Sequence, residues 1–145
     1  LDALFTRFDA LAERHGLEKI KTIGDAYMAV AGLPEPRTDH AVAAARMALD
    51  MQAEVEAFAR ETGHDLAIRV GLHSGPVIGK KKFIYDLWGD TVNTASRMES
   101  HGVPGRVHVS DRTRELLGGC MTSEDRGTIT VKGKGELRTW LLSKP

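Results

Sequence analysis

Residues 19–28 read Lys-Ile-Lys-Thr-Ile-Gly-Asp-Ala-Tyr-Met, and they contain two short apolar runs separated by Gly24-Asp25. Each run has the length and composition of a strand, and the second extends to Ala31. Pairs of glycine and aspartate tolerate the positive φ of a tight turn. The stretch therefore predicts a β-hairpin with Gly24-Asp25 at its turn.

Helices are predicted on both sides of this hairpin. Apolar residues recur at helical spacing over residues 1–15, and Gly16 is placed to end that helix. Thr38 or Asp39 is suited to cap a second helix, which runs to about Glu61. We expect the apolar face of the second helix to include Val42, Ala45, Leu49, Val55 and Phe58.

The rest of the chain alternates between strand and helix patterns. Strands are predicted over residues 66–72, 83–85, 106–109, 128–131 and 138–142. Helices are predicted over residues 90–100 and 110–117, the latter with a capping residue at its start. This interleaving indicates an α+β or α/β sandwich, in which helices pack on one face of a mixed sheet.

Composition places the chain among ordinary globular domains. Its 145 residues suit one domain, residues 1–145, and 41% of them are hydrophobic. The 20 basic residues balance the 20 acidic ones, which argues against nucleic-acid binding through a bulk basic field but leaves room for a local basic pocket. Cys120 is the single cysteine, so no intrachain disulfide can form. No apolar run approaches the ~20 residues of a membrane span.

Three stretches contain side chains suited to chemistry, and the first is the hairpin itself. An acid such as Asp25 is common in turns for conformational reasons alone. A carboxylate that projects from a rigid turn also suits a hard cation such as Mg²⁺ or Mn²⁺. One carboxylate makes a poor metal site, so the second interpretation requires another ligand nearby.

The second and third stretches offer groups suited to a phosphorylated ligand. Asn93 and Arg97 are four residues apart and share one face of the predicted helix, where they are either solvated or able to grip sugar and phosphate oxygens. We expect the apolar residues of that helix to face the core. Residues 131–135 read Val-Lys-Gly-Lys-Gly, which is either a plain hairpin loop or a place where Lys132 and backbone amides approach phosphates.

Together these stretches resemble the class III nucleotidyl cyclase catalytic domain, the family of adenylyl and guanylyl cyclases. The phrases at residues 18–28, 85–100 and 131–135 match its signatures in the right order, and residues 71–77 resemble its central strand and turn. The resemblance implies a ferredoxin-like βαββαβ-type mixed sheet with helices packed on it and additional strands. It also implies that the family's first strand, with a second metal aspartate, precedes Leu1.

The resemblance assigns a role to each candidate residue. Family members attack the α-phosphorus of a nucleoside triphosphate with the ribose 3′-oxygen and release pyrophosphate, assisted by two divalent ions, Mg²⁺ or Mn²⁺. By similarity Asp25 is a metal ligand and Asn93 positions the ribose. Arg97 stabilises charge on the α-phosphate, and Lys132 binds the triphosphate, with Lys134 as the alternative.

The resemblance also predicts the base and the assembly. In the family a lysine–aspartate pair selects adenine, and the matching positions hold Lys21 and Asp86. Lysine only donates and aspartate only accepts, which suits N1 and the N6 amino group of adenine. The expected reaction is ATP to cyclic AMP. The expected partner is a second copy, since family homodimers take the metal aspartates from one subunit and the base-reading residues from the other.

Two departures from the family keep an alternative open. The first strand is absent, and residues 75–79 are shorter than the family's segment, which we expect to reflect missing residues. The alternative is a catalytically inactive cyclase-homology domain that binds nucleotide or regulates a partner; a ferredoxin-like nucleic-acid module fits the charge balance poorly. We expect a cytoplasmic domain; the sequence leaves open whether the parent protein is soluble or membrane-anchored and whether it has upstream regulatory regions.

Overall fold

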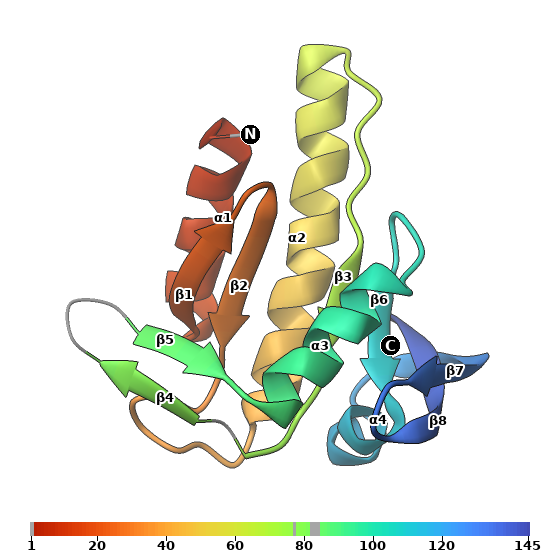
Figure 1. Ribbon diagram of the computed structural model, residues 1–145. Coiled ribbons are helices and arrows are strands. Elements are labelled where there is room, and N and C mark those ends of the chain that lie inside the picture. The colour runs from red at the N-terminus through yellow and green to blue at the C-terminus, as the bar shows by residue number, and fades with distance from the viewer. Residues whose placement is uncertain (1, 77, 82–84) are drawn as a thin grey trace. The chain divides into compact units, whose positions relative to one another are not determined.

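The computed structural model describes residues 2–76, 78–81 and 85–145, and for residues 2, 23, 78–81 and 85–88 it describes the backbone alone. Its helices are α1 (Asp2–His15), α2 (His40–Thr62), α3 (Asp90–Ser100) and α4 (Asp111–Leu117) (Figure 1). Its strands are β1 (Glu18–Ile23), β2 (Ala26–Val30), β3 (Val70–Leu72), β4 (Ile78–Lys81), β5 (Tyr85–Trp88), β6 (Val107–Ser110), β7 (Thr122–Val131) and β8 (Gly135–Ser143).

The strands form three sheets within the described residues. β1 pairs with β2, β4 pairs with β5, and the third sheet has the order β3-β6-β8-β7. In this four-stranded sheet β3 and β6 are parallel and the other pairs are antiparallel. The predicted α+β class with a mixed sheet is therefore confirmed. The chain folds as two compact units, Leu1–Ala67 with Ile78–Leu87 and Ile68–Val77 with Trp88–Pro145.

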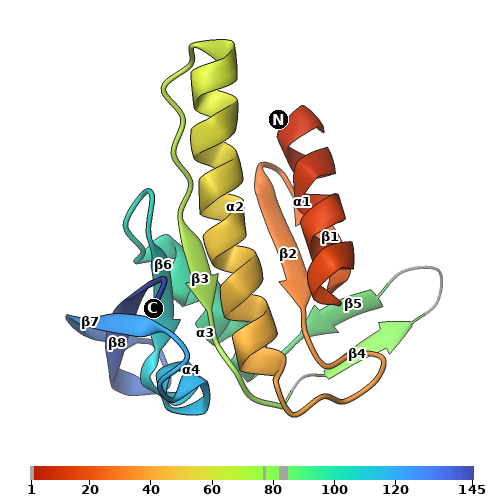
Figure 2. The same ribbon diagram turned by 180° about the vertical axis from the view of Figure 1, so that it is seen from behind.

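In the first unit, α1 packs against α2 and lies beside the β1–β2 hairpin (Figure 2). The predicted helix and the predicted hairpin are both confirmed, and Gly16 follows α1 with a φ of 75°. The ring of Tyr27 meets those of Phe5 and Phe8 edge-on, each at 5.6 Å between centroids. The Tyr27 hydroxyl donates to Asp9 at 2.8 Å, so aromatic packing and a hydrogen bond join the hairpin to α1.

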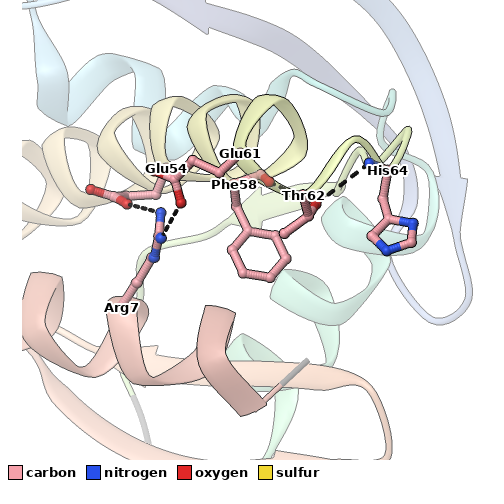
Figure 3. A network of polar contacts seen from close by, with 6 residues as sticks. All are labelled: Arg7, Glu54, Phe58, Glu61, Thr62 and His64. Atoms are coloured by element: carbon pink, nitrogen blue, oxygen red, sulfur yellow. Dashed lines mark hydrogen bonds and ion pairs between the residues drawn. The ribbon is translucent and has the colours of Figure 1, made fainter.

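A polar network joins α1 to the far end of α2 (Figure 3). Arg7 donates to Glu54 at 3.3 Å and to Glu61 at 2.6 Å, and its guanidinium carbon lies 5.2 Å from the centroid of the Phe58 ring. Beyond it, the Thr62 hydroxyl donates to the Phe58 carbonyl at 2.8 Å. These contacts order the last turns of α2, where few apolar side chains are buried.

The prediction of the α2 core face is wrong in part. Ala45 and Val55 are buried as expected, but Val42, Leu49 and Phe58 are only half-buried. Val42 and Leu49 each follow a buried alanine by one position, which rotates them by about 100° from it. The face that is buried instead contains Ala41, Ala43, Ala45, Met47, Ala48, Met51, Gln52 and Val55.

The predicted start of α2 is in the right place, but the predicted cap bond is absent. Asp39 occupies the N-cap position without a side-chain bond to the helix. Its carboxylate accepts instead from Arg37, at 2.8 and 3.0 Å. This ion pair lowers the pKa of Asp39 and raises that of Arg37.

In the second unit, the core lies in the central strands β6 and β8, where Val107, Val109 and Leu142 are almost completely buried. The predicted helix over residues 110–117 is confirmed, with Ser110 accepting from the Thr113 amide at its N-cap. The closing strands β7 and β8 are longer than predicted, because they pair with each other along their length.

One other strand prediction needs correction, and another lies mostly outside the described residues. The strand expected over residues 66–72 begins only at Val70, since its partner β6 begins opposite it at Val107, and Leu66 is exposed. The strand expected at residues 83–85 falls mostly outside the described residues, and Tyr85 begins β5.

Candidate active site

The β1–β2 hairpin carries Lys21 and Asp25. A β-bulge lies between Lys19 and Lys21, which pair with Ala29 and Met28. Ile20 within the bulge is buried at 2% exposure, so the apolar core anchors this point of the strand. A bulge bends the strand and re-aims neighbouring side chains, and Lys21 is half-buried directly beside it.

Lys19 and Lys21 differ in their surroundings although they are close in sequence. The Lys19 ammonium lies 3.2 Å from Asp9 of α1 and 5.5 Å from the centroid of the Tyr27 ring. Lys19 is therefore part of the contact between the hairpin and α1. Lys21 lies on the other side of the bulge, where it pairs with Met28.

Asp25 lies at the turn between β1 and β2. Ile23 pairs with Ala26, so the turn consists of Gly24 and Asp25, and Gly24 has a φ of 59°. The Asp25 side chain is exposed. Over residues 2–76, 78–81 and 85–145, no group of three or more His, Cys, Asp or Glu side chains is placed to hold a metal ion. Asp25 therefore offers one oxygen ligand at an accessible tip.

Asp86 lies in β5, in the first unit, like Lys21 and Asp25. Only its backbone position is described. The structure thus places this residue on a strand that pairs with β4.

In the second unit, α3 presents Asn93 and Arg97 to solvent on one side. The predicted bounds of this helix are confirmed at both ends. Its buried stripe consists of Thr91, Thr94 and Met98, which recur at i, i+3 and i+7. Of the apolar residues expected to face the core, Met98 does so, but Val92 and Ala95 are only half-buried. Two threonines replace them in the core stripe.

The β7–β8 turn brings a lysine to the start of α3. The Lys134 ammonium lies 2.7 Å from the carboxylate of Asp90, in the first turn of that helix. Asp90 and Lys134 also act on His73, which lies directly after β3. Burial and Lys134 lower the pKa of His73, and Asp90 opposes them. Lys132 in the same turn is exposed.

Sequence reasoning missed the Lys134–Asp90 pair. Lys134 was expected only as an alternative triphosphate ligand, and Asp90 had no role. The one available signal was an acid in the first turn of a predicted helix and a lysine-containing loop, which seldom identifies a pair. The predicted site residues fall into two groups. The first unit contains Lys21, Asp25 and Asp86, and the second contains Asn93, Arg97 and Lys132.

Comparison with known proteins identifies the class of domain. The family model described as "Adenylate and Guanylate cyclase catalytic domain" matches residues 1–144. The chain therefore belongs to the adenylate and guanylate cyclase family, and it is a nucleotidyl cyclase catalytic domain.

Some individual relatives are named as adenylate cyclases and others as guanylate cyclases. The chain is 48% identical over 146 residues to "Adenylate cyclase" of Mycobacterium tuberculosis (strain ATCC 25618 / H37Rv), covering 98% of this chain and 33% of that protein. It is 45% identical to "Guanylate cyclase soluble subunit beta-2" of Homo sapiens, covering 98% of this chain and 24% of that protein. The chain thus spans about a third or less of the length of these relatives.

A solved structure confirms the fold. It is the catalytic core of a rhodopsin-guanylyl cyclase with converted specificity in complex with ATPαS. Its TM-score is 0.93 at 44% identity, and the match covers 99% of this chain and 80% of that one. Among the described residues, no helix is both long and apolar enough to span a membrane.

Proposed function

We propose that this domain converts ATP to 3′,5′-cyclic AMP and pyrophosphate. The carrying observation is the pair at the base-reading positions, Lys21 beside the bulge of β1 and Asp86 on β5. The name of the mycobacterial relative agrees with it, whereas the human relative is named for guanylate.

The chemistry of this pair favours adenine over guanine. Adenine accepts at ring N1 and donates from its N6 amino group, so a lysine and an aspartate complement it. Guanine presents the reverse pattern, a carbonyl at O6 and a donor at N1. Each polar group that a mismatch leaves buried without a partner costs about 1–3 kcal/mol, so two mismatches exceed the energy of a tenfold preference.

The exposed face of α3 supplies the groups for the reacting end of the substrate. In the proposed reaction the 3′-oxygen forms a bond to the α-phosphorus, its proton passes to solvent, and the bond from the α-phosphorus to the bridging oxygen of pyrophosphate breaks. Asn93 positions the ribose, and the Arg97 guanidinium stabilises negative charge on the α-phosphate oxygens. Lys132, exposed in the β7–β8 turn, binds the triphosphate.

Asp25 fits a ligand of Mg²⁺ or Mn²⁺, since its carboxylate is exposed at a rigid two-residue turn. A complete site for two ions requires further oxygen ligands besides this one. When bound, such ions favour ionisation of the attacking hydroxyl and neutralise charge on the triphosphate.

We further propose that the domain acts as a homodimer, with Asp25 and Lys21 of one chain serving different active sites. The two residues lie on one hairpin, yet they serve the metal and the base respectively. The arrangement implies that each active site combines Asp25 of one chain with Lys21 and Arg97 of the other.

The test is to measure cyclic nucleotide formation by the full-length protein with Mn²⁺, offering ATP and GTP separately. We expect cyclic AMP, hardly any cyclic GMP, and a loss of at least about 100-fold in kcat for Arg97→Ala. Arg60→Ala, which removes an exposed arginine of α2, is the matched control and should keep full activity. A folded dimer that forms neither product would show instead a nucleotide-binding or regulatory module.

A further inference from the structure

The last turn of α3 contains a carbonyl that the helix itself does not satisfy. The amide of His101 donates to the carbonyl of Arg97 at 3.0 Å, and the amide of Gly102 donates to the carbonyl of Glu99 at 3.0 Å. A regular helix would direct the Gly102 amide to the carbonyl of Met98 instead. That carbonyl accepts from Nδ1 of His108 at 2.7 Å, so a side chain of β6 caps this turn of α3.

This bond defines the protonation state of His108. A carbonyl can only accept, so Nδ1 carries the proton and, in the neutral ring, Nε2 is bare. His108 is completely buried, and its Nε2 has no partner within the described part of the chain. A proton on Nε2 would therefore add an unpaired donor to the core. Burial is the main cause that lowers the pKa of His108; the bond to the Met98 carbonyl opposes it, and the nearby Arg126 and His101 lower the pKa further.

A second contact meets the same point of the helix. A Cβ atom at Gly71 of β3 would come closest to the amide nitrogen of Glu99, and it would lie 2.5 Å from the carbonyl carbon of Met98 and 2.7 Å from Cα of Glu99. The strand and helix backbones therefore touch at Met98–Glu99. Since β3 and β6 are neighbours, with Gly71 paired to His108, both contacts come from one row of the sheet.

We propose that His108 is a positioning residue of the active site, which fixes the α3 backbone at Met98 and thereby sets the position of the adjoining Arg97. This proposal rests on the proposed function of Arg97. The bond from His108 meets the backbone at Met98, directly after Arg97. The side chain of Arg97 is exposed, so the core does not hold it in place. A catalytic guanidinium on a long side chain depends on its backbone anchor for precise placement.

Two variants separate hydrogen bonding from packing. His108→Asn retains an N–H donor at the position of Nδ1, and His108→Leu fills much of the space without a donor. With ATP and Mn²⁺ in the full-length protein, we expect His108→Leu to lower kcat at least about tenfold with KM nearly unchanged, because Arg97 acts on the transition state. His108→Asn should keep kcat within about threefold of the wild type.

Val109→Ala is the control for general loss of packing. Val109 is fully buried on the same strand, and strand alternation directs it to the opposite face of the sheet from His108. The Val109→Ala variant should have a lower melting temperature than the wild type without the large loss in kcat that we expect for His108→Leu. Equal kcat in His108→Leu and His108→Asn, at comparable melting temperatures, would overturn the proposal.

A measurement on the unsubstituted protein needs neither variant nor activity. Nitrogen-15 NMR of the imidazole should show a protonated Nδ1 and a bare Nε2 for His108, and titration should give a pKa below that of an ordinary histidine. The opposite tautomer would overturn the proposal. Failure of the proposed function would show differently, as a wild-type protein that forms no cyclic AMP.

Discussion

Gly71→Ala tests whether the approach of β3 to α3 controls activity. The added Cβ would lie 2.5 Å from the Met98 carbonyl carbon and nearer still to the Glu99 amide nitrogen, whereas ordinary contact begins at 3.4 Å. Because all three nearest atoms are backbone, no side chain can rotate away, and the helix must recede by about 1 Å or more. Overpacking of this kind costs about 1–3 kcal/mol of stability. A misplacement of 1 Å costs on the order of 100-fold in rate when it affects groups that act on the transition state.

The assay is cyclic AMP formation with kcat and KM determined separately, beside a thermal melt. Gly119→Ala is the matched control, since a Cβ there meets nothing within 4 Å and the residue needs no positive φ. We expect Gly71→Ala to lower kcat about 100-fold below the temperature at which it unfolds, and Gly119→Ala to match the wild type. A folded Gly71→Ala protein with kcat within about twofold of the wild type would refute the reasoning.

Further predictions address the assembly, the substrate and the stability of the second unit. Lys21→Ala and Asp25→Ala homodimers should each be nearly inactive, and mixing them should restore activity through one intact site per heterodimer; heterodimers without any rescue would contradict the arrangement. Lys21→Glu combined with Asp86→Cys should shift the product from cyclic AMP toward cyclic GMP, measured with both triphosphates, because a carboxylate accepts from N1–H of guanine and a thiol donates to its O6. Ser110→Ala removes the N-cap of α4 and the hydrogen-bond partner of His73 Nδ1 at 2.6 Å, so it should lower the free energy of unfolding by about 1–3 kcal/mol. Denaturant titrations should show a smaller loss for Ser143→Ala, which changes an exposed serine.

The elements that sequence reasoning predicted well are those with local determinants. The hairpin turn at Gly24-Asp25 depends on the positive φ that glycine supplies, and the structure has 59° there. The α4 helix begins at Asp111, directly after its N-cap residue Ser110, whose side chain accepts from the Thr113 amide within the same turn. In both cases the deciding contact lies within a few residues, so the pattern contains it.

The elements that were mispredicted depend on distant partners. The length of β3 is set by the start of β6 at Val107, which is 37 positions later than Val70. The sequence around Val70 therefore does not indicate where β3 begins. The α3 core stripe contains Thr91 and Thr94, which hydropathy counts as polar although they are buried. The stripe spacing was correct for a helix, but the choice of face required knowledge of what packs against it.

The same division applies to the active site. Motif resemblance predicts residues that bind the substrate, such as Arg97, because their chemistry is characteristic. It assigns no role to His108 or Gly71, because neither a histidine nor a glycine in a strand is by itself a functional signal. The role that we propose for them depends on where they meet α3, at a carbonyl that lacks its helical partner and at a contact too close for a side chain.

The Lys134–Asp90 pair shows why the lysine loop is hard to interpret from sequence. An exposed ion pair is worth only about 0–1 kcal/mol, so the 2.7 Å contact with Asp90 does not withdraw Lys134 from a phosphate. A triphosphate at the start of α3 would bring negative charge near Asp90, and Lys134 would then balance both. Lys132 has no such role in the described contacts and can serve the substrate alone. The two lysines of the motif therefore differ in their contacts, since among the described residues Lys134 has an ion-pair partner in another element.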